Sequence, residues 1–287
     1  MQAGADYAEA VLRRLQETLV ENEIVFEFFD LPPVAFLHSI DASVRHWSME
    51  ISPESHDAEV RRAQEGESVY DNQQFEQLLH EALRLRCTRL DVFFMIGLPR
   101  QTRRSVQDTV AYCERLFQRS DRRLSCFISP MGPFLDPGSR VFEEPEKFGY
   151  RLFARSLEEH RRLLLQRSWE QILNYETEWM NRAELVEATY DAGEALNRAK
   201  MRYGRISMAR GKAVARRIQA ARDLRARLAA NQNQHGEAQR ILEGEIAKFS
   251  ASTVCDRREL FWPRHLINFK VREILAILYR SYSADRR

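Results

Sequence analysis

Polar or glycine-containing segments follow three apolar runs of the sequence. They are residues 49–55 (Met-Glu-Ile-Ser-Pro-Glu-Ser), residues 97–99 (Gly-Leu-Pro) and residues 129–139, a loop rich in proline and glycine. Neighbouring parallel strands bring their carboxyl ends to the same edge of a sheet, and α/β folds bind ligands at that edge. The order of the segments therefore predicts one ligand site to which all three contribute.

The side chains of the first segment suit hydrogen bonding to a polar ligand. Ser52, Glu54 and Ser55 can exchange hydrogen bonds with sugar hydroxyls or with an amino group. Arg61 and Arg62 follow soon afterwards and are candidates for contact with a carboxylate. The alternative is that the two serines cap the next helix and that Glu54 is solvated.

The second segment suits contact with a planar group. Gly97 has no side chain, so a ring can approach its backbone closely. Phe94, Met95 and Ile96 precede it and offer an apolar surface and backbone hydrogen bonds to an adenine. The alternative is that a strand simply leaves its sheet through the turn at residues 97–99.

Strand-like and helix-like segments alternate over the first part of the chain, which predicts parallel strands joined by crossover helices. Four such units are too few to close an eight-stranded barrel, so we expect an open sheet or a partial barrel. We predict helices at residues 6–22, 34–40, 71–86 and from 102 onward, and strands at 24–29, 46–52, 90–96 and 124–129.

Helical patterns dominate after the loop at residues 129–139. Ser156 with Glu159 three residues later is a capping-box signature. We expect further helices at residues 169–203, 209–230, 236–249 and 265–280. The predicted fold is α/β: an incomplete parallel partial barrel of about four strands in residues 1–150, followed by an all-α region in residues 151–287. His160 is expected on a helix surface.

Composition excludes several classes of protein. The net charge is +2, and no apolar run approaches the ~20 residues that span a bilayer, so we predict a cytoplasmic protein without membrane contact. The four cysteines have no closely spaced pair, and the histidines are scattered, so no metal site is predicted. Buried free thiols in a reducing compartment are the simplest interpretation; they are Cys87, Cys113, Cys126 and Cys255.

A strongly basic segment is hidden by the near-neutral total charge. Residues 198–230 contain eleven Lys and Arg against one acid, Asp223. Such a segment can bind RNA phosphates or another polyanion. Few aromatic residues are available there to stack on bases, and a solvated helix face balanced by acidic neighbours is the alternative.

Several motifs occur in the order typical of a known family. They are residues 45–55, Tyr70-Asp71-Asn72 and residues 94–102, which resemble the later strands of a radical S-adenosylmethionine enzyme. Residues 133–139, 148–150, 168–169 and 173–177 resemble more closely the subgroup that carries an amino-terminal cobalamin-binding domain. The resemblance extends over about residues 5–205.

This resemblance implies a partial (β/α)6 barrel, a [4Fe-4S] cluster on a CxxxCxxC loop, and reductive cleavage of S-adenosylmethionine to a 5′-deoxyadenosyl radical. It further implies that Arg61 lies near the methionine carboxylate. Independently of the resemblance, Asp136 and Ser139 in the proline-rich loop are candidates for substrate contact, although these two residues can equally cap a turn. The remaining cofactor contacts that it implies are Glu50, Ser52, Glu54 and Ser55 near the ribose and methionine, and Met95, Ile96, Gly97, Leu98 and Pro99 on the adenine side.

The sequence departs from the family at one decisive point, because it contains no CxxxCxxC loop. We therefore expect the carboxyl-terminal part of such an enzyme, inactive alone and completed by a separate amino-terminal polypeptide that binds the cluster and cobalamin. The alternative is a non-catalytic binding protein whose basic segment holds an anionic partner such as RNA.

Overall fold

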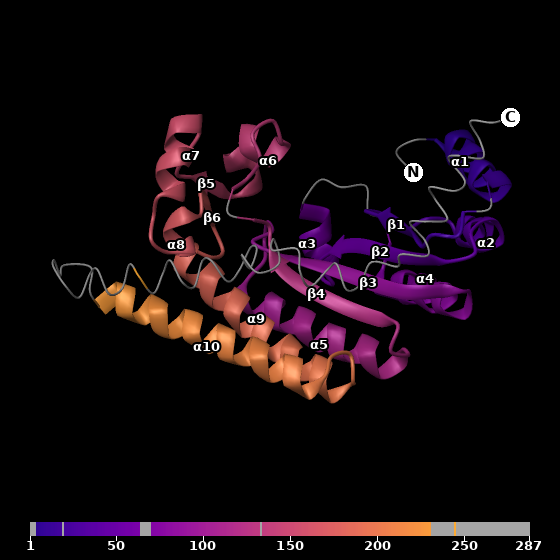
Figure 1. The fold of residues 1–287 in the computed structure, drawn as a ribbon. Coiled ribbons are helices and arrows are strands. Elements are labelled where there is room, and N and C mark those ends of the chain that lie inside the picture. The colour runs from indigo at the N-terminus through magenta and orange to yellow at the C-terminus, as the bar shows by residue number, and fades with distance from the viewer. Residues whose placement is uncertain (1–3, 19, 64–69, 133, 231–243, 245–287) are drawn as a thin grey trace, which may run out of the picture. The chain divides into compact units, whose positions relative to one another are not determined.

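The computed structural model describes residues 4–18, 20–63, 70–132, 134–230 and 244 (Figure 1). Residues up to Arg227 belong to one compact unit, and the chain after it is assigned to a second unit, of which only residues 228–230 and 244 are described. The helix predicted at residues 265–280 and Cys255 lie outside the described residues, as does the helix predicted at 236–249 apart from residue 244.

A parallel sheet of four strands forms the centre of the first unit. The strands follow the order β1-β2-β3-β4, and every neighbouring pair is parallel. This confirms the predicted α/β fold with an incomplete parallel barrel of about four strands. The strands are β1 (Ile24–Phe28), β2 (Trp47–Glu54), β3 (Cys87–Ile96) and β4 (Leu124–Pro130).

Helices cover one face of this sheet. Because side chains alternate along a strand, Trp47, Met49 and Ile51 of β2 share one face, and each is at most 1% exposed. Phe94 of β3 meets Tyr112 on that face with ring centroids 6.1 Å apart. The helices of this part are α1 (Ala5–Thr18), α2 (Val34–Ser43), α3 (Ala58–Ala63), α4 (Asn72–Arg84) and α5 (Arg103–Arg119).

We call the opposite side of the sheet the inner face. It carries the alternate residues of each strand, with Phe127 36% and Val25 46% exposed at its two edges. The register aligns Glu27, Glu50 and Asp91 in one row across β1, β2 and β3.

A small region separates β4 from the last helices. We call residues 131–181 the cap region; Figure 1 shows it at one end of the sheet, away from α1 and α2. Its strands β5 and β6 pair antiparallel. Its elements are α6 (Arg140–Glu143), the 3-10 helix η1 (Pro145–Phe148), β5 (Tyr150–Leu152), α7 (Leu157–Leu164), α8 (Trp169–Ile172) and β6 (Tyr175–Thr177).

The structure interrupts the helix expected over residues 169–203. Leu173 ends α8 at φ −52°, ψ 122°, and the chain then pairs as β6 with β5 before α9 (Arg182–Arg202) begins. The apolar spacing alone cannot separate a helix from a short buried strand, and here strand pairing decides. The Ser156–Glu159 capping box is confirmed at the start of α7.

The α9 helix packs against α5 and β4. The domain boundary expected near residue 150 stays a prediction. Among the described helices, none is long and apolar enough to cross a membrane.

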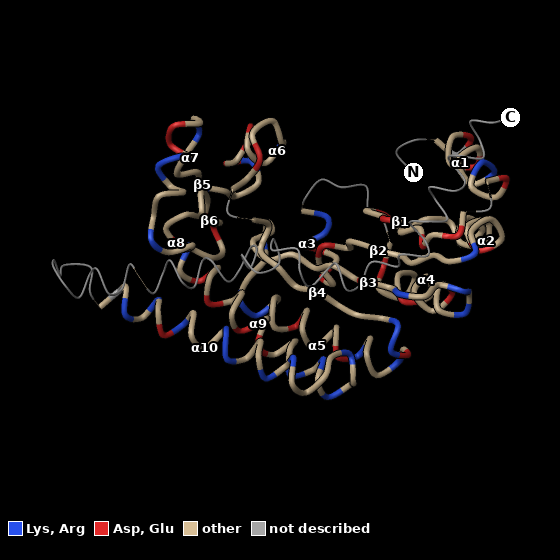
Figure 2. Tube along the Cα trace, in the orientation of Figure 1, with Lys and Arg blue, Asp and Glu red and all other residues tan. Residues whose placement is uncertain are grey.

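The last described helix, α10 (Met208–Ala230), is held against α8 and α9 by a cluster of ion pairs, which we call the ion-pair clasp. Arg222 contacts Glu187 at 2.6 Å and Asp191 at 2.7 Å. Arg225 contacts Glu170 at 2.6 Å and also pairs with Glu187. Figure 2 shows basic residues recurring along α10. Part of the basic segment is therefore neutralised within the fold.

Glu187→Gln is expected to lower the free energy of unfolding by about 1–2 kcal/mol, because it removes an acid shared by two partly buried arginines. Urea denaturation measures this, and the loss should shrink in 1 M NaCl because salt already weakens, in the wild-type protein, the ion pairs that the change removes. Glu194→Gln is the control, since its pair with Arg198 is more exposed. Equal effects of the two changes would contradict the clasp.

Candidate functional site

The turn after β3 is closed by a buried glutamine. Gln101 is 1% exposed, and its Oε1 accepts hydrogen bonds from the backbone N–H groups of Gly97 (2.8 Å) and Leu98 (3.3 Å). Its Nε2 donates to the Met95 carbonyl at 2.9 Å. The amide thus satisfies three backbone groups of the segment for which the sequence predicted adenine contact.

Two tyrosines of the cap region lie against Gly97. The Tyr150 hydroxyl donates to the Gly97 carbonyl at 2.8 Å. Gly97 has φ +98°, and a Cβ placed on it would lie 2.9 Å from the Tyr175 hydroxyl oxygen. Burial raises the pKa of both tyrosines, so both keep their protons at neutral pH. The close approach that the glycine permits is therefore made by Tyr175 of this chain.

Strand alternation divides the other residues predicted on the adenine side. Ile96 is 1% and Leu98 0% exposed, and Pro99 is buried as well. Met95 is half-buried and lies on the inner face with Phe93. Met95 therefore directs its side chain to the inner face, whereas Ile96 packs in the core with Phe94.

The end of β2 forms a strained turn. Glu54 has φ +62°, a conformation that is uncommon for a residue with a side chain. Ser55 is 1% exposed, and its hydroxyl accepts a hydrogen bond from the Asp57 N–H at 3.1 Å. Glu54 also adds to the raised pKa of Tyr150, after burial and Tyr175. Glu54 pairs in register with Phe94 of β3, so the structure brings the end of β2 close to the turn at Gly97.

Arg61 connects the end of β2 to neighbouring segments through buried hydrogen bonds. It is 4% exposed, and its Nη1 donates to the Ser55 carbonyl at 2.8 Å and to Asn72 Oδ1 at 3.1 Å. Its Nη2 donates to the Tyr70 carbonyl at 3.1 Å. The Nε atom is buried without a hydrogen-bond partner in the described structure. The guanidinium holds the β2–α3 connection in place.

The inner face carries a short charge network. Arg89 lies 3.6 Å from Glu50 and 3.2 Å from Asp91. Burial raises the pKa of Asp91, with Arg89 opposing the shift and Glu50 adding to it. Glu50 of the predicted set lies on this face, in the row of Glu27. Ser52 follows two residues later, where the register between β2 and β3 shifts, and it is only 6% exposed.

Aromatic side chains and a lysine, which sequence reasoning missed, lie beside this network. Phe93 and Phe127 stack with centroids 4.9 Å apart at 16°. The Lys200 ammonium of α9 lies 3.8 Å from the centroid of Phe127. Strand alternation could have placed the two rings on one face, whereas nothing in the basic segment distinguishes Lys200 from its neighbours.

The predicted substrate loop lies at the start of the cap region. Ser139 caps α6, because its hydroxyl accepts a hydrogen bond from the Phe142 N–H at 3.3 Å. Asp136 is exposed. Asn174 fixes this loop, because its Oδ1 accepts a hydrogen bond from the backbone N–H of Leu135 at 2.9 Å.

The surface position predicted for His160 is wrong, because the residue is only 8% exposed. Its Nδ1 donates to the Ser156 carbonyl at 2.8 Å, and its Nε2 accepts from Asn174 Nδ2 at 2.9 Å. The charged residues around His160 in the sequence suggested a solvated helix, whereas its buried partner Asn174 comes from another part of the cap region.

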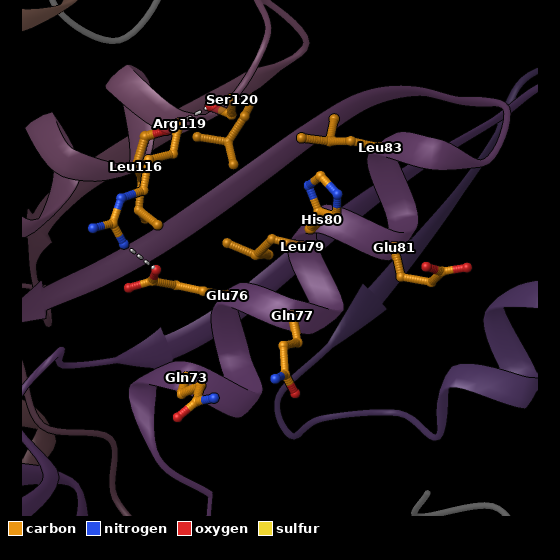
Figure 3. A pocket seen from close by; sticks show the side chains of 11 residues that line it. Gln73, Glu76, Gln77, Leu79, His80, Glu81, Leu83, Leu116, Arg119 and Ser120 are labelled. Atoms are coloured by element: carbon orange, nitrogen blue, oxygen red, sulfur yellow. Dashed lines mark hydrogen bonds and ion pairs between the residues drawn. The ribbon is translucent and has the colours of Figure 1, made fainter.

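A groove of about 650 Å³ lies elsewhere, between α4 and α5. Figure 3 shows Glu76 and Arg119 meeting across it, at 2.9 Å. Leu79, Leu83 and Leu116 also line it. None of the residues predicted to bind cofactor or substrate lines this groove, which lies on the helical layer and not at the strand ends.

The described residues offer no site for a metal cluster. They contain no group of three or more His, Cys, Asp or Glu arranged to hold a metal ion. Cys87, Cys113 and Cys126 are buried free thiols. Burial raises the pKa of Cys87 to about 11, so this thiol stays protonated.

The sequence matches no family model and no curated protein. Among solved structures, the chain is similar to coproporphyrinogen III oxidase (HemN) from Escherichia coli, described as a radical SAM enzyme, with a TM-score of 0.36 and 18% identity over 60% of this chain. The chain spans 46% of the length of that structure. A similarity this remote identifies neither the family nor the activity.

Gly97→Ala is expected to lower the free energy of unfolding by about 2–4 kcal/mol, from left-handed backbone strain and overpacking against Tyr175. Gly138→Ala should cost only about 1–2 kcal/mol, because its φ is +85° but no atom lies near its Cβ. Urea denaturation measures both. Tyr175→Phe should recover part of the loss in a double-mutant cycle, and strict additivity would contradict the contact.

His56 predicts a pH dependence of stability. Its Nδ1 lies 2.8 Å from the Thr109 hydroxyl, and its ring stacks on Tyr112. Burial lowers its pKa in the folded protein from the ordinary 6.5. The unfolded chain therefore binds the proton more readily, so stability is lost as pH falls below 6.5. Denaturation at pH 7.5 and 5.5 should show a smaller loss in His56→Gln; an unchanged loss would contradict this.

Proposed function

We propose that this chain forms the nucleoside side of the S-adenosylmethionine pocket in a radical enzyme of the cobalamin-binding subgroup. An amino-terminal polypeptide supplies the cluster loop and the cobalamin domain. The resemblance of residues 5–205 suggests the family, and the parallel sheet agrees with it. The observation that carries the proposal is that Glu50 and Met95 share the inner face beside Phe93, with Ser52 two residues beyond Glu50 on β2.

These residues suit the parts of a nucleoside. The Glu50 carboxylate accepts hydrogen bonds from vicinal ribose hydroxyls, and the Ser52 hydroxyl can donate or accept. Met95 provides a polarisable surface for the adenine ring. The backbone of residues 97 and 98 is already bonded to Gln101, so in this proposal the turn shapes the pocket and the inner face makes the contacts.

Other residues of the predicted set support the pocket. Arg61 and Ser55 fix the turn that presents Glu54, and Arg61 remains the proposed neighbour of the methionine carboxylate through its unpaired Nε. Asp136 stays the proposed substrate contact of the cap region. When bound, S-adenosylmethionine supplies a 5′-deoxyadenosyl radical after one-electron reduction by the partner's cluster.

The alternative, a polyanion-binding protein, receives less support. Arg198, Arg202, Arg222 and Arg225 of the basic segment form ion pairs within the fold. Arg205 donates to the carbonyls of residues 117 and 120. These contacts reduce the positive charge that the segment can offer to RNA, so we favour the enzyme proposal.

S-adenosylmethionine binding to Ser52→Ala should be about tenfold weaker than to wild type, the effect of one lost hydrogen bond. Equilibrium dialysis of the chain with its amino-terminal polypeptide measures this. Ser39→Ala, an exposed serine on α2, is the matched control and should bind like wild type.

The same mixture, with its cluster reconstituted and reduced, should release 5′-deoxyadenosine. An unchanged dissociation constant in Ser52→Ala would place the nucleoside elsewhere. Failure of the complete mixture to cleave S-adenosylmethionine would contradict the assignment to the radical family.

A further inference from the structure

The inner face separates its apolar and acidic side chains into adjacent rows. Glu27, Glu50 and Asp91 form the acidic row. Phe93 and Phe127, paired by register, form the next row on the same face, two residues closer to the carboxyl ends of their strands. A ligand on this face therefore meets a carboxylate row on one side and an aromatic row on the other.

The two cations of this face differ in how they are compensated. Arg89 lies between Glu50 and Asp91, so its charge is neutralised. Lys200 is half-buried, and in the described part of the chain its ammonium contacts the face of the Phe127 ring and forms no ion pair. A cation–π contact replaces only part of the hydration that an ammonium loses.

The groups around Lys200 leave this charge available to a ligand. The ionisable neighbours are Asp91 of β3, Arg210 of α10 and the buried thiols of Cys113 and Cys126. Burial lowers the pKa of Lys200 and raises that of Cys113 well above its ordinary value, so the Cys113 thiol is uncharged. An incoming anion would restore the lost solvation of the ammonium.

We infer that the inner face binds an organic anion whose apolar body rests on Phe93 and Phe127 and whose carboxylate or phosphate pairs with Lys200. The acidic row repels the anionic group from the rest of the face, so one orientation is favoured. The statement that this anion is a substrate rests on the proposed function. The statement that the anion binds at this face rests on the geometry alone.

Three flat probes of one shape test the site without S-adenosylmethionine: 2-naphthoate, 2-naphthyl phosphate and the neutral 2-naphthamide. Calorimetry on the full chain should show saturable binding of at least one anion, at least tenfold tighter than the amide. The stronger of the two anions identifies whether a carboxylate or a phosphate is preferred. Equal affinity for the amide, or no saturable binding of either anion, overturns the inference.

Variants assign the binding to Lys200. Lys200→Gln should weaken the anion at least tenfold, and Lys200→Arg should retain most of the affinity. Lys212→Gln, which removes an exposed lysine of α10, is the matched control and should leave binding unchanged. Circular dichroism checks that each variant is folded. If folded Lys200→Gln binds the anion as wild type does, the inference is wrong.

A second readout does not depend on any variant. Pairing with an anion should raise the pKa of Lys200, which the Cε chemical shift of labelled lysine follows by NMR; no change on saturation would contradict the pairing.

Anion binding without S-adenosylmethionine binding would refute the proposed function alone. S-adenosylmethionine cleavage without anion binding would refute this inference alone.

Discussion

The hydrogen bond from the Tyr150 hydroxyl to the Gly97 carbonyl joins the two parts of the molecule that form the site. One partner belongs to the turn at the end of the central strand β3, and the other belongs to β5 of the cap region. Gln101 fixes the same turn from the sheet side. A buried hydroxyl and a buried amide without these partners would each cost about 1–3 kcal/mol, so the turn and the cap region constrain each other strongly.

This constraint determines where a ligand can lie. Tyr175 takes the space beside Gly97, and Gln101 takes the free backbone groups of residues 95, 97 and 98. Side chains of the protein itself therefore fill the space beside Gly97 at the carboxyl end of β3 and occupy the backbone hydrogen-bonding groups there. The inner face keeps side chains of mixed chemistry, with carboxylates on one row and aromatic rings on the next. At its β4 edge it keeps the ammonium of Lys200, which contacts Phe127 and forms no ion pair in the described part of the chain.

The sequence predicts the framework because its signals are local. Each of the four strands was expected from an apolar run, and the cap of α7 from Ser156 and Glu159. Local patterns also identified the turn at Gly97 as special. They could not show that Tyr175 fills it, because β6 reaches the turn only after the chain has built the cap region.

The same limit explains the other differences. His160 is surrounded by charged residues in sequence, and only the fold places Asn174 against it. Lys200 belongs to a basic segment, and only the packing of α9 brings it to Phe127. The two strands β5 and β6 are three residues long, too short to give a periodic signal.

Hydrogen–deuterium exchange of the chain with and without S-adenosylmethionine, in the presence of the proposed amino-terminal polypeptide, tests most directly whether the inner face holds the nucleoside. The account predicts ligand-dependent protection in peptides that cover residues 50–55 and 93–97. Protection confined to the α4–α5 groove, in peptides covering residues 73–83 and 116–124, would contradict it, as would no protection at a saturating ligand concentration.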